Sequence, residues 1–168
     1  SAIKIYSNDF RQIVECPNLE SLVYDGTLDL IKAGIKMMKP TFGFDLQIGC
    51  DFPPGSGLGG SASLLASVVA AFNEFRSNKL NRYEIAEFAY EAERIELSIA
   101  GGWQDQYSTV FGGCNFMEYS ESKNLVQNLI LPNNLFDEFS SGKPNITSSA
   151  SSDIEENSPI DNIIYIVF

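Results

Sequence analysis

Short segments of the chain alternate between hydrophobic and polar residues, which predicts β-strands. Apolar residues take every second position from Ile3 onward and again from Phe44 to Cys50, and Ile13 begins a further short candidate. Later in the chain, apolar strand patterns cover residues 115–119, 125–131 and 163–168. The first two of these predict a hairpin that turns around residues 121–124.

Other segments carry the spacing of helices. Leu28, Ile31, Ile35 and Met38 share one helical face after a turn at residues 25–27, and Pro40 ends that helix. Residues 64–75 are apolar nearly all round, which predicts a buried helix.

A third predicted helix begins at a capping box, in which Asn81 precedes Glu84 by three residues. Its apolar stripe runs from Ile85 to Ile99, and the glycines at 101 and 102 end it. A short helix follows over 104–111. The pattern predicts an α+β fold, with a mixed or antiparallel sheet, helices mainly on one face, and the buried helix at the centre.

The chain changes character after Pro132. Residues 140–158 include seven serines, which is typical of a linker or surface loop, and an apolar strand pattern resumes at Ile163. We therefore expect one domain over residues 1–131, with residues 132–168 as a linker and part of a second domain. A buried strand at the very end of the chain suggests a cut inside a larger fold.

Composition narrows the possible functions. The 168 residues contain 22 Asp and Glu against 11 Lys and Arg, a net charge of −11, without a basic run that could neutralise phosphates. This argues against binding to nucleic acid or to an anionic membrane. The chain has no histidine, which excludes a Ser-His-Asp triad, a Cys-His pair and His-ligated zinc. Proton transfer must then use a carboxylate, Lys, Tyr, Cys or water.

The three cysteines indicate the compartment. Cys16, Cys50 and Cys114 are odd in number and form no CxxC pair, so we expect small buried hydrophobic residues in a reducing environment. The sequence shows neither a signal peptide nor an 18-residue apolar run. A cytoplasmic protein is expected.

Four glycines, at 55, 57, 59 and 60, separate a predicted strand from the buried helix. Glycine admits positive φ and close approach of a ligand, and the start of the helix adds unpaired N–H groups. This arrangement predicts a phosphate site, to which Ser61 adds a hydroxyl. It is not a Walker A loop, because no lysine follows, and the Rossmann spacing fails as well. A plain tight turn is the alternative.

The candidate catalytic groups are carboxylates. Asp105 follows the Gly101-Gly102 break and has uncharged neighbours, which suits a half-buried group that orients or deprotonates a hydroxyl. A helix N-cap is the alternative. Glu93 extends the apolar stripe of the third helix, and its alternative is a salt bridge with Arg94 or a lysine. Lys32, Lys36 and Lys39 read as the solvated face of the first helix rather than as a phosphate clamp. Glu87, Glu91 and Glu96, near Glu93, are expected to be solvated.

Several of these motifs together resemble a known family. The run from Pro54 to Ala62 is similar to the PxxxGLGSSA signature of the GHMP kinases, although Gly60 replaces its first serine. The Glu93-Arg94 pair, the GGWQDQY run at 101–107 and the FGG that follows it resemble the branch with heptose 7-phosphate kinases and L-fucokinases. The segment from Tyr24 to Lys32 favours heptose 7-phosphate within that branch.

The resemblance implies roles for individual residues. ATP phosphates would contact Pro54, Gly55, Ser56, Gly57, Leu58, Gly59, Gly60, Ser61 and Ala62. Mg²⁺ would be held by Ser61 and Glu93. Asp105 would be the acid/base or orienting residue, and Gly101, Gly102 and Gln104 would shape the acceptor site.

The implied reaction is transfer of the ATP γ-phosphate to the anomeric hydroxyl of D-glycero-D-manno-heptose 7-phosphate, for nucleotide-activated heptose and surface glycans. The chain would correspond to the central part of such a kinase, without the family's first and third motifs. An L-fucokinase-like enzyme, a non-catalytic nucleotide or sugar binder, and an inactive fragment remain alternatives.

Overall fold

The computed structural model describes residues 2–50, 55–120, 122–131 and 163–166, the last as backbone only. It divides into two compact units, residues 1–111 and 112–168, which are described separately. The predicted linker at 140–158 lies outside the described residues.

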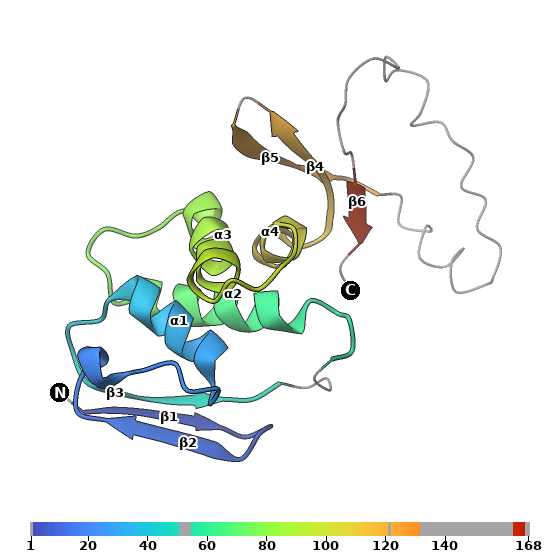
Figure 1. Ribbon diagram of the computed structural model, residues 1–168. Coiled ribbons are helices and arrows are strands. Elements are labelled where there is room, and N and C mark those ends of the chain that lie inside the picture. The colour runs from blue at the N-terminus through green and yellow to red at the C-terminus, as the bar shows by residue number, and fades with distance from the viewer. Residues whose placement is uncertain (1, 51–54, 121, 132–162, 167–168) are drawn as a thin grey trace. The chain divides into compact units, whose positions relative to one another are not determined.

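The first unit contains a three-stranded mixed sheet (Figure 1). Its strands are β1 (Ile3–Ser7), β2 (Gln12–Cys16) and β3 (Phe44–Ile48). The central strand β1 pairs antiparallel with β2, where Ile5 faces Val14, and parallel with β3, where Ile5 faces Leu46. Burial alternates along β1, since Ile3 and Ile5 are buried while Lys4 is exposed. One face of the sheet is therefore covered, as the alternating pattern predicts.

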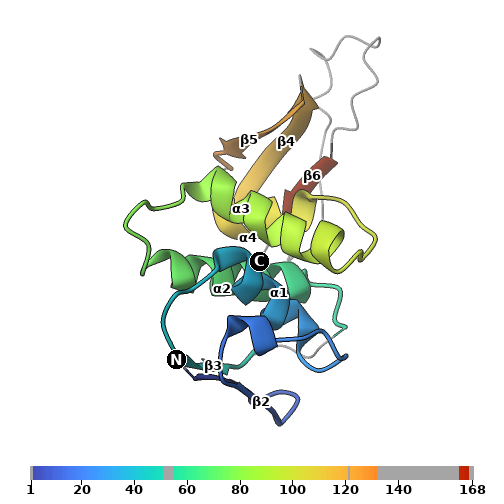
Figure 2. The ribbon, with the colours of Figure 1, turned by 60° about the vertical axis from the view of Figure 1, so that its left-hand side comes forward.

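Helices form two layers on that covered face (Figures 1 and 2). The sequence order is η1 (Leu19–Ser21), α1 (Asp29–Met38), α2 (Gly60–Asn73), α3 (Arg82–Tyr90), η2 (Glu91–Glu96) and α4 (Gln104–Phe111). Helices α1 and α2 lie next to the sheet, and α3 and α4 pack against α2 on its far side. The mixed sheet with helices on one face confirms the predicted α+β class.

Two clusters of apolar side chains hold these layers together. Between the sheet and the first helix layer, Ile5 meets Ile35 of α1 and Val69 of α2. Between the helices, Leu65 of α2 packs against alanines, including Ala33 and Ala89. Small residues let the helix axes approach closely. Helix α2 thus contributes to both clusters, as its nearly continuous apolar sequence predicts, although Ser67 and Ala71 remain exposed.

The third predicted helix differs from expectation at its C-terminal end. The capping box is present, because Asn81 accepts a hydrogen bond from the Glu84 backbone and Glu84 accepts one from Asn81. After Tyr90, however, the α-helix continues as the π-helical turn η2 and ends at Glu96. Ile99 therefore lies beyond the helix, 42% exposed, rather than on its apolar stripe.

One lysine and two cysteines depart from the predicted burial. Lys36 is half-buried and Lys39 exposed, but Lys32 is only 1% exposed, so the prediction of a solvated face is wrong for Lys32. All three cysteines are free, yet only Cys114 is buried; Cys16 is half-buried and Cys50 is exposed.

The second unit contains an antiparallel sheet in the order β5-β4-β6. Its strands are β4 (Cys114–Ser120), β5 (Lys123–Leu129) and β6 (Ile163–Ile166). Strands β4 and β5 form the predicted hairpin, with Ser120 opposite Lys123. None of the helices in the described ranges is long and apolar enough to cross a membrane.

Candidate phosphate and acceptor site

The glycine-rich loop requires glycine for its backbone path. Gly55, Gly57 and Gly59 have φ values of +77°, +75° and +71°. These lie in the left-handed region, where a residue with a side chain would be strained. At Gly55 and Gly57 a Cβ atom would meet open space, so conformation rather than crowding selects glycine there. Pro54 lies outside the described residues.

The loop ends directly at the start of α2. Gly59 is the N-cap residue and makes no side-chain cap, and Ser63 donates the first intrahelical bond to the Gly59 carbonyl at 2.9 Å. The N–H groups before Ser63 have no partner inside the helix. Ser61 is exposed on this first turn, whereas Ala62 is fully buried and anchors it. The helix start is therefore open to an anion from solvent.

Asp105 lies beside the end of the loop. A Cβ atom at Gly59 would stand 3.9 Å from Asp105 Cβ and 4.0 Å from its carboxyl carbon. Asp105 is the second residue of α4, so it lies inside the first turn rather than at the N-cap, where its charge still favours the helix dipole. It is exposed, so the expectation of a half-buried group is wrong. The fold nevertheless brings together two predicted motifs that are more than 40 residues apart.

Glu93 is only 3% exposed and belongs to η2. Its Oε2 accepts a hydrogen bond from Gln106 Nε2 at 2.5 Å, and its Oε1 lies 3.7 Å from Arg94 Nη1. The ion pair with Arg94, given above as the alternative for Glu93, is therefore present. Glu93 and Arg94 are adjacent in sequence and would not face each other on an α-helix. They lie in a π-helical turn, whose spacing differs from that of an α-helix.

The surroundings of Glu93 fit a magnesium ion chemically. Gln106 is fully buried, and within the described ranges its Oε1 has no hydrogen-bond partner. An orphaned oxygen beside a carboxylate suits Mg²⁺ or a water bound to it. No three Asp, Glu or Cys side chains converge in the described part of the chain. A magnesium ion at Glu93 would therefore need further oxygen ligands, such as substrate phosphates or water. Ser61 is on α2, which packs against η2.

Two of the predicted acceptor residues, Gly101 and Gly102, lie on the loop between η2 and α4, and Gln104 is the first residue of α4. The Gln104 side chain folds over Gly102 so closely that a Cβ atom there would overlap its amide. Gly101, at φ +155°, lies under the Arg94 guanidinium, and a Cβ atom there would overlap it as well. A side chain at Gly101 would therefore displace the Arg94 guanidinium, and one at Gly102 would displace the Gln104 amide.

Sequence reasoning missed three features of this region. Gln106 was not recognised as the partner of Glu93, although a polar residue next to Asp105 on a short helix is a usable signal. Glu96, expected to be solvated, accepts a hydrogen bond from Tyr24 at 2.8 Å. Burial, followed by this bond, raises the pKa of Tyr24. Glu87, also expected to be solvated, accepts a hydrogen bond from Tyr107 at 2.6 Å.

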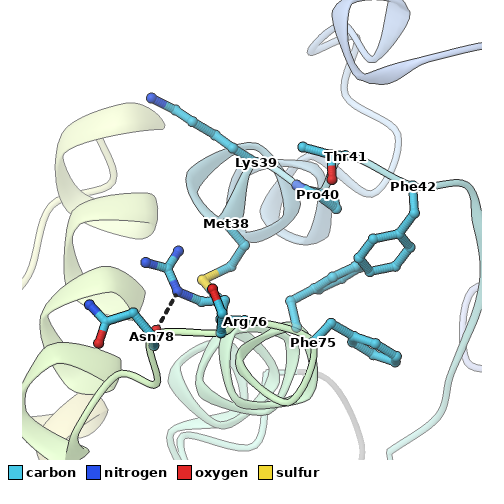
Figure 3. A pocket seen from close by; sticks show the side chains of 10 residues that line it. Met38, Lys39, Pro40, Thr41, Phe42, Phe75, Arg76 and Asn78 are labelled. Atoms are coloured by element: carbon cyan, nitrogen blue, oxygen red, sulfur yellow. Dashed lines mark hydrogen bonds between the residues drawn. The ribbon is translucent and has the colours of Figure 1, made fainter.

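Two surface cavities are present in the described part of the first unit. One, of about 270 Å³, lies between β3 and the beginning of α2 and reaches Gly60 and Ser63. The other, of about 250 Å³, lies where α1 and α2 end (Figure 3). There Phe42 and Phe75 lie side by side, with ring centroids 5.1 Å apart, and Lys39 points away. This second cavity is lined by none of the predicted site residues.

Comparison with known proteins identifies the family. The model of the GHMP kinase N-terminal domain matches residues 24–113, more than half of the chain. The chain is 42% identical over 127 residues to D-glycero-α-D-manno-heptose 7-phosphate kinase of Campylobacter jejuni. This alignment covers 73% of the chain and 38% of that enzyme. It is 32% identical over 116 residues to a galactokinase of Thermococcus kodakarensis, across 66% of the chain and 33% of the relative.

Solved structures agree with this assignment. A D-glycero-D-manno-heptose 1-phosphate kinase from Bacteroides thetaiotaomicron superposes with a TM-score of 0.72 at 33% identity, over 82% of this chain and 47% of that one. A sugar kinase from Campylobacter jejuni superposes with a TM-score of 0.71 at 40% identity. The match covers 82% of this chain and 44% of that one. The chain spans less than half the length of each of these relatives. Since the family model covers the loop, Glu93 and Asp105, the chain belongs to the GHMP kinase family.

Proposed function

We propose that the protein is an ATP-dependent sugar kinase that phosphorylates the anomeric hydroxyl of D-glycero-D-manno-heptose 7-phosphate. One observation carries the proposal: Asp105 lies against Gly59, at the point where the glycine-rich loop enters α2. A phosphate-binding loop and a carboxylate must be adjacent if the carboxylate is to act on a hydroxyl that attacks the γ-phosphate. The similarity to heptose phosphate kinases supports this choice of acceptor.

In the proposed reaction, residues 54–62 hold the triphosphate through backbone N–H groups and the positive end of the α2 dipole. Mg²⁺, held by Ser61 and Glu93, would neutralise charge on the phosphates. Gln106 orients the Glu93 carboxylate through its amide. Asp105 accepts the proton of the attacking hydroxyl or orients that hydroxyl, and Gly101, Gly102 and Gln104 shape the acceptor site.

The product would supply nucleotide-activated heptose for surface glycans. We infer a cytoplasmic location, because free cysteines and the use of ATP suit a reducing compartment. The proposed partners are small molecules, a sugar phosphate and ATP, rather than nucleic acid or a membrane.

Phosphorus NMR on the protein in its natural full length, with Mg-ATP and heptose 7-phosphate, tests the reaction. An anomeric phosphate signal that grows together with ADP is expected. A signal only with L-fucose would instead support an L-fucokinase-like enzyme, in line with the 34% identity over 76 residues to a Bacteroides fragilis L-fucokinase/L-fucose-1-P guanylyltransferase. Bound ligands without turnover would indicate a non-catalytic binder.

Asp105→Asn tests the assigned role. The amide keeps the size of the side chain but cannot take a proton, so we expect kcat to fall by about 10²- to 10⁴-fold. The dissociation constant of Mg-ATP, measured by calorimetry, should change less than about twofold, since the loop is untouched. Asp45→Asn, on an exposed position of β3, is the control and should behave like the wild type. Undiminished transfer by Asp105→Asn would remove Asp105 from this role.

A further inference from the structure

One side chain holds the loop between η2 and α4. Arg94 Nε donates a hydrogen bond to the Gly102 carbonyl at 3.2 Å, and Nη1 donates to the Ala100 carbonyl at 3.0 Å. Nη1 also reaches the Ile99 carbonyl at 3.5 Å. The Arg94 side chain is 13% exposed and keeps its ion pair with Glu93. A rigid planar fork of donors thus holds three backbone carbonyls of this loop, those of Ile99, Ala100 and Gly102.

The loop and the guanidinium fit each other closely. Gly101 lies under the guanidinium, where any side chain would overlap it. Ser98, with φ +55°, begins the loop in the left-handed region, and Ile99 N–H donates back to the Glu93 carbonyl at 3.1 Å. Tyr24 holds the end of η2 through Glu96. The path from Ser98 to Gly102 is therefore determined by side chains of other elements, with Arg94 at its centre.

The planarity of the peptide bond gives this arrangement a consequence. In a trans peptide, the carbonyl and the following N–H point in opposite directions, and the described chain contains no cis bonds. Carbonyls 99 and 100 point to Arg94, so the N–H groups of Ala100 and Gly101 point away from it. Residues 98–102 are exposed, and within the described part of the chain these two N–H groups donate to no protein acceptor. Two adjacent donors thus face outward, four and five residues before Asp105.

We propose that Arg94 is a positioning residue for the sugar acceptor. By binding the loop carbonyls it turns the Ala100 and Gly101 N–H groups outward, where they bind oxygen atoms of the acceptor sugar phosphate. Adjacent backbone N–H groups are suitable donors to hydroxyl and phosphate oxygens. This role rests on the proposed kinase function. It requires no contact between Arg94 and the substrate, because the guanidinium acts on the far side of the loop.

Substitution of Arg94 in the full-length protein tests the inference. Arg94→Ala removes the donors, and we expect the KM and the dissociation constant of heptose 7-phosphate to rise about 10- to 100-fold. The dissociation constant of ATP measured without Mg²⁺ should stay within about twofold, because Arg94 does not hold the glycine-rich loop, whereas Mg-ATP would also respond to the lost ion pair with Glu93. Arg94→Lys keeps the charge but lacks the fork, so it should show the same selective loss. Gly101→Ala, which displaces the guanidinium, should reproduce it. Arg82→Ala, on the exposed first turn of α3, is the matched control.

Chemical rescue separates positioning from general stability. Guanidinium ion at millimolar concentration should restore sugar affinity to Arg94→Ala, whereas ammonium should not, because only the planar ion can bind two carbonyls. Calorimetry reads sugar binding without turnover, so a protein that binds the sugar phosphate but transfers no phosphate would contradict the kinase proposal alone. Unchanged sugar affinity in the Arg94 variants, or an equal loss of ATP affinity, would overturn the role of Arg94. A wild-type protein that binds no sugar phosphate would overturn both.

Discussion

At the scale of single residues, a buried ammonium organises the turn before α1. Lys32 Nζ donates to the Val23 carbonyl at 2.9 Å, to Asp25 Oδ1 at 2.5 Å and to Asp29 Oδ1 at 3.2 Å. The bond from Lys32 is the main cause that lowers the pKa of Asp25. Burial opposes ionisation of Asp29, but bonds from the Gly26 and Asp25 N–H groups and from Lys32 lower its pKa. The amphipathic pattern could not show this, because a lysine on the polar face reads as solvated.

This cluster predicts unequal effects on stability. The double variant Asp25→Asn, Asp29→Asn leaves the buried Lys32 ammonium without these two counter-charges, and we expect it to lower the free energy of unfolding more than Lys32→Met does. Lys32→Met removes the ammonium itself and keeps the apolar stem, so its cost should be about 1 kcal/mol, since Asp25 remains exposed to water. Urea unfolding measures both, with Lys39→Met as the exposed control. A larger loss for Lys32→Met than for the double variant would contradict this account.

At the scale of elements, the π-helical turn η2 decides where the charged residues of the site lie. The sequence predicts a continuous helix to Ile99, because the i, i+4 spacing of Ile85, Ala89 and Glu93 continues the apolar stripe. The structure confirms the burial of Glu93. It also places Arg94 so that its side chain binds the loop that follows η2, at the Ala100 carbonyl. A π-helical turn has no clear signature in one sequence, since it depends on packing against neighbouring helices.

Close packing of α1 on α2 gives a test at the same scale. A Cβ atom at Gly34 would lie 3.1 Å from Leu65 Cδ2 and from Val68 Cγ1. Gly34→Leu should therefore overpack this contact and lower the free energy of unfolding by about 1–3 kcal/mol. Gly34→Ala is the matched smaller substitution. Its free energy of unfolding should stay within about 1 kcal/mol of the wild type, because the better helix propensity of alanine offsets the tight contact. Urea unfolding that ranks the two variants equally would show that the helices separate easily here.

At the scale of the whole molecule, the apolar core of the first unit is centred on α2 and β1. Ile5, Leu65 and Val69 are completely buried, whereas Ile13 of the outer strand β2 is 55% exposed. The central strand β1 pairs on both sides, and α2 packs against α1 in its own layer and against α3 and α4 in the next. Regions with the most buried apolar contacts open least often.

Hydrogen exchange of the full-length protein, followed by mass spectrometry, should show this order. We expect the slowest amides of the first unit in β1 and in residues 64–70 of α2. Exchange in β2 should be faster, because among the described strands it pairs only with β1. Peptides of β2 that exchange as slowly as those of α2 would mean that the sheet edge is covered, contrary to this expectation.

The sequence by itself determined the fold class and most of the helices and strands, and it nominated the residues of the candidate site. Alternation fixed the strands, helical spacing fixed the helices, and the four glycines with the Asp105 segment indicated the family, because these signals are local and depend on backbone geometry. Only the tertiary structure decided which groups meet. Asp105 against Gly59, Gln106 on Glu93, Arg94 over Gly101 and the buried Lys32 each join parts of the chain through packing. Such contacts depend on how helices and loops approach one another, which no local pattern of residues specifies.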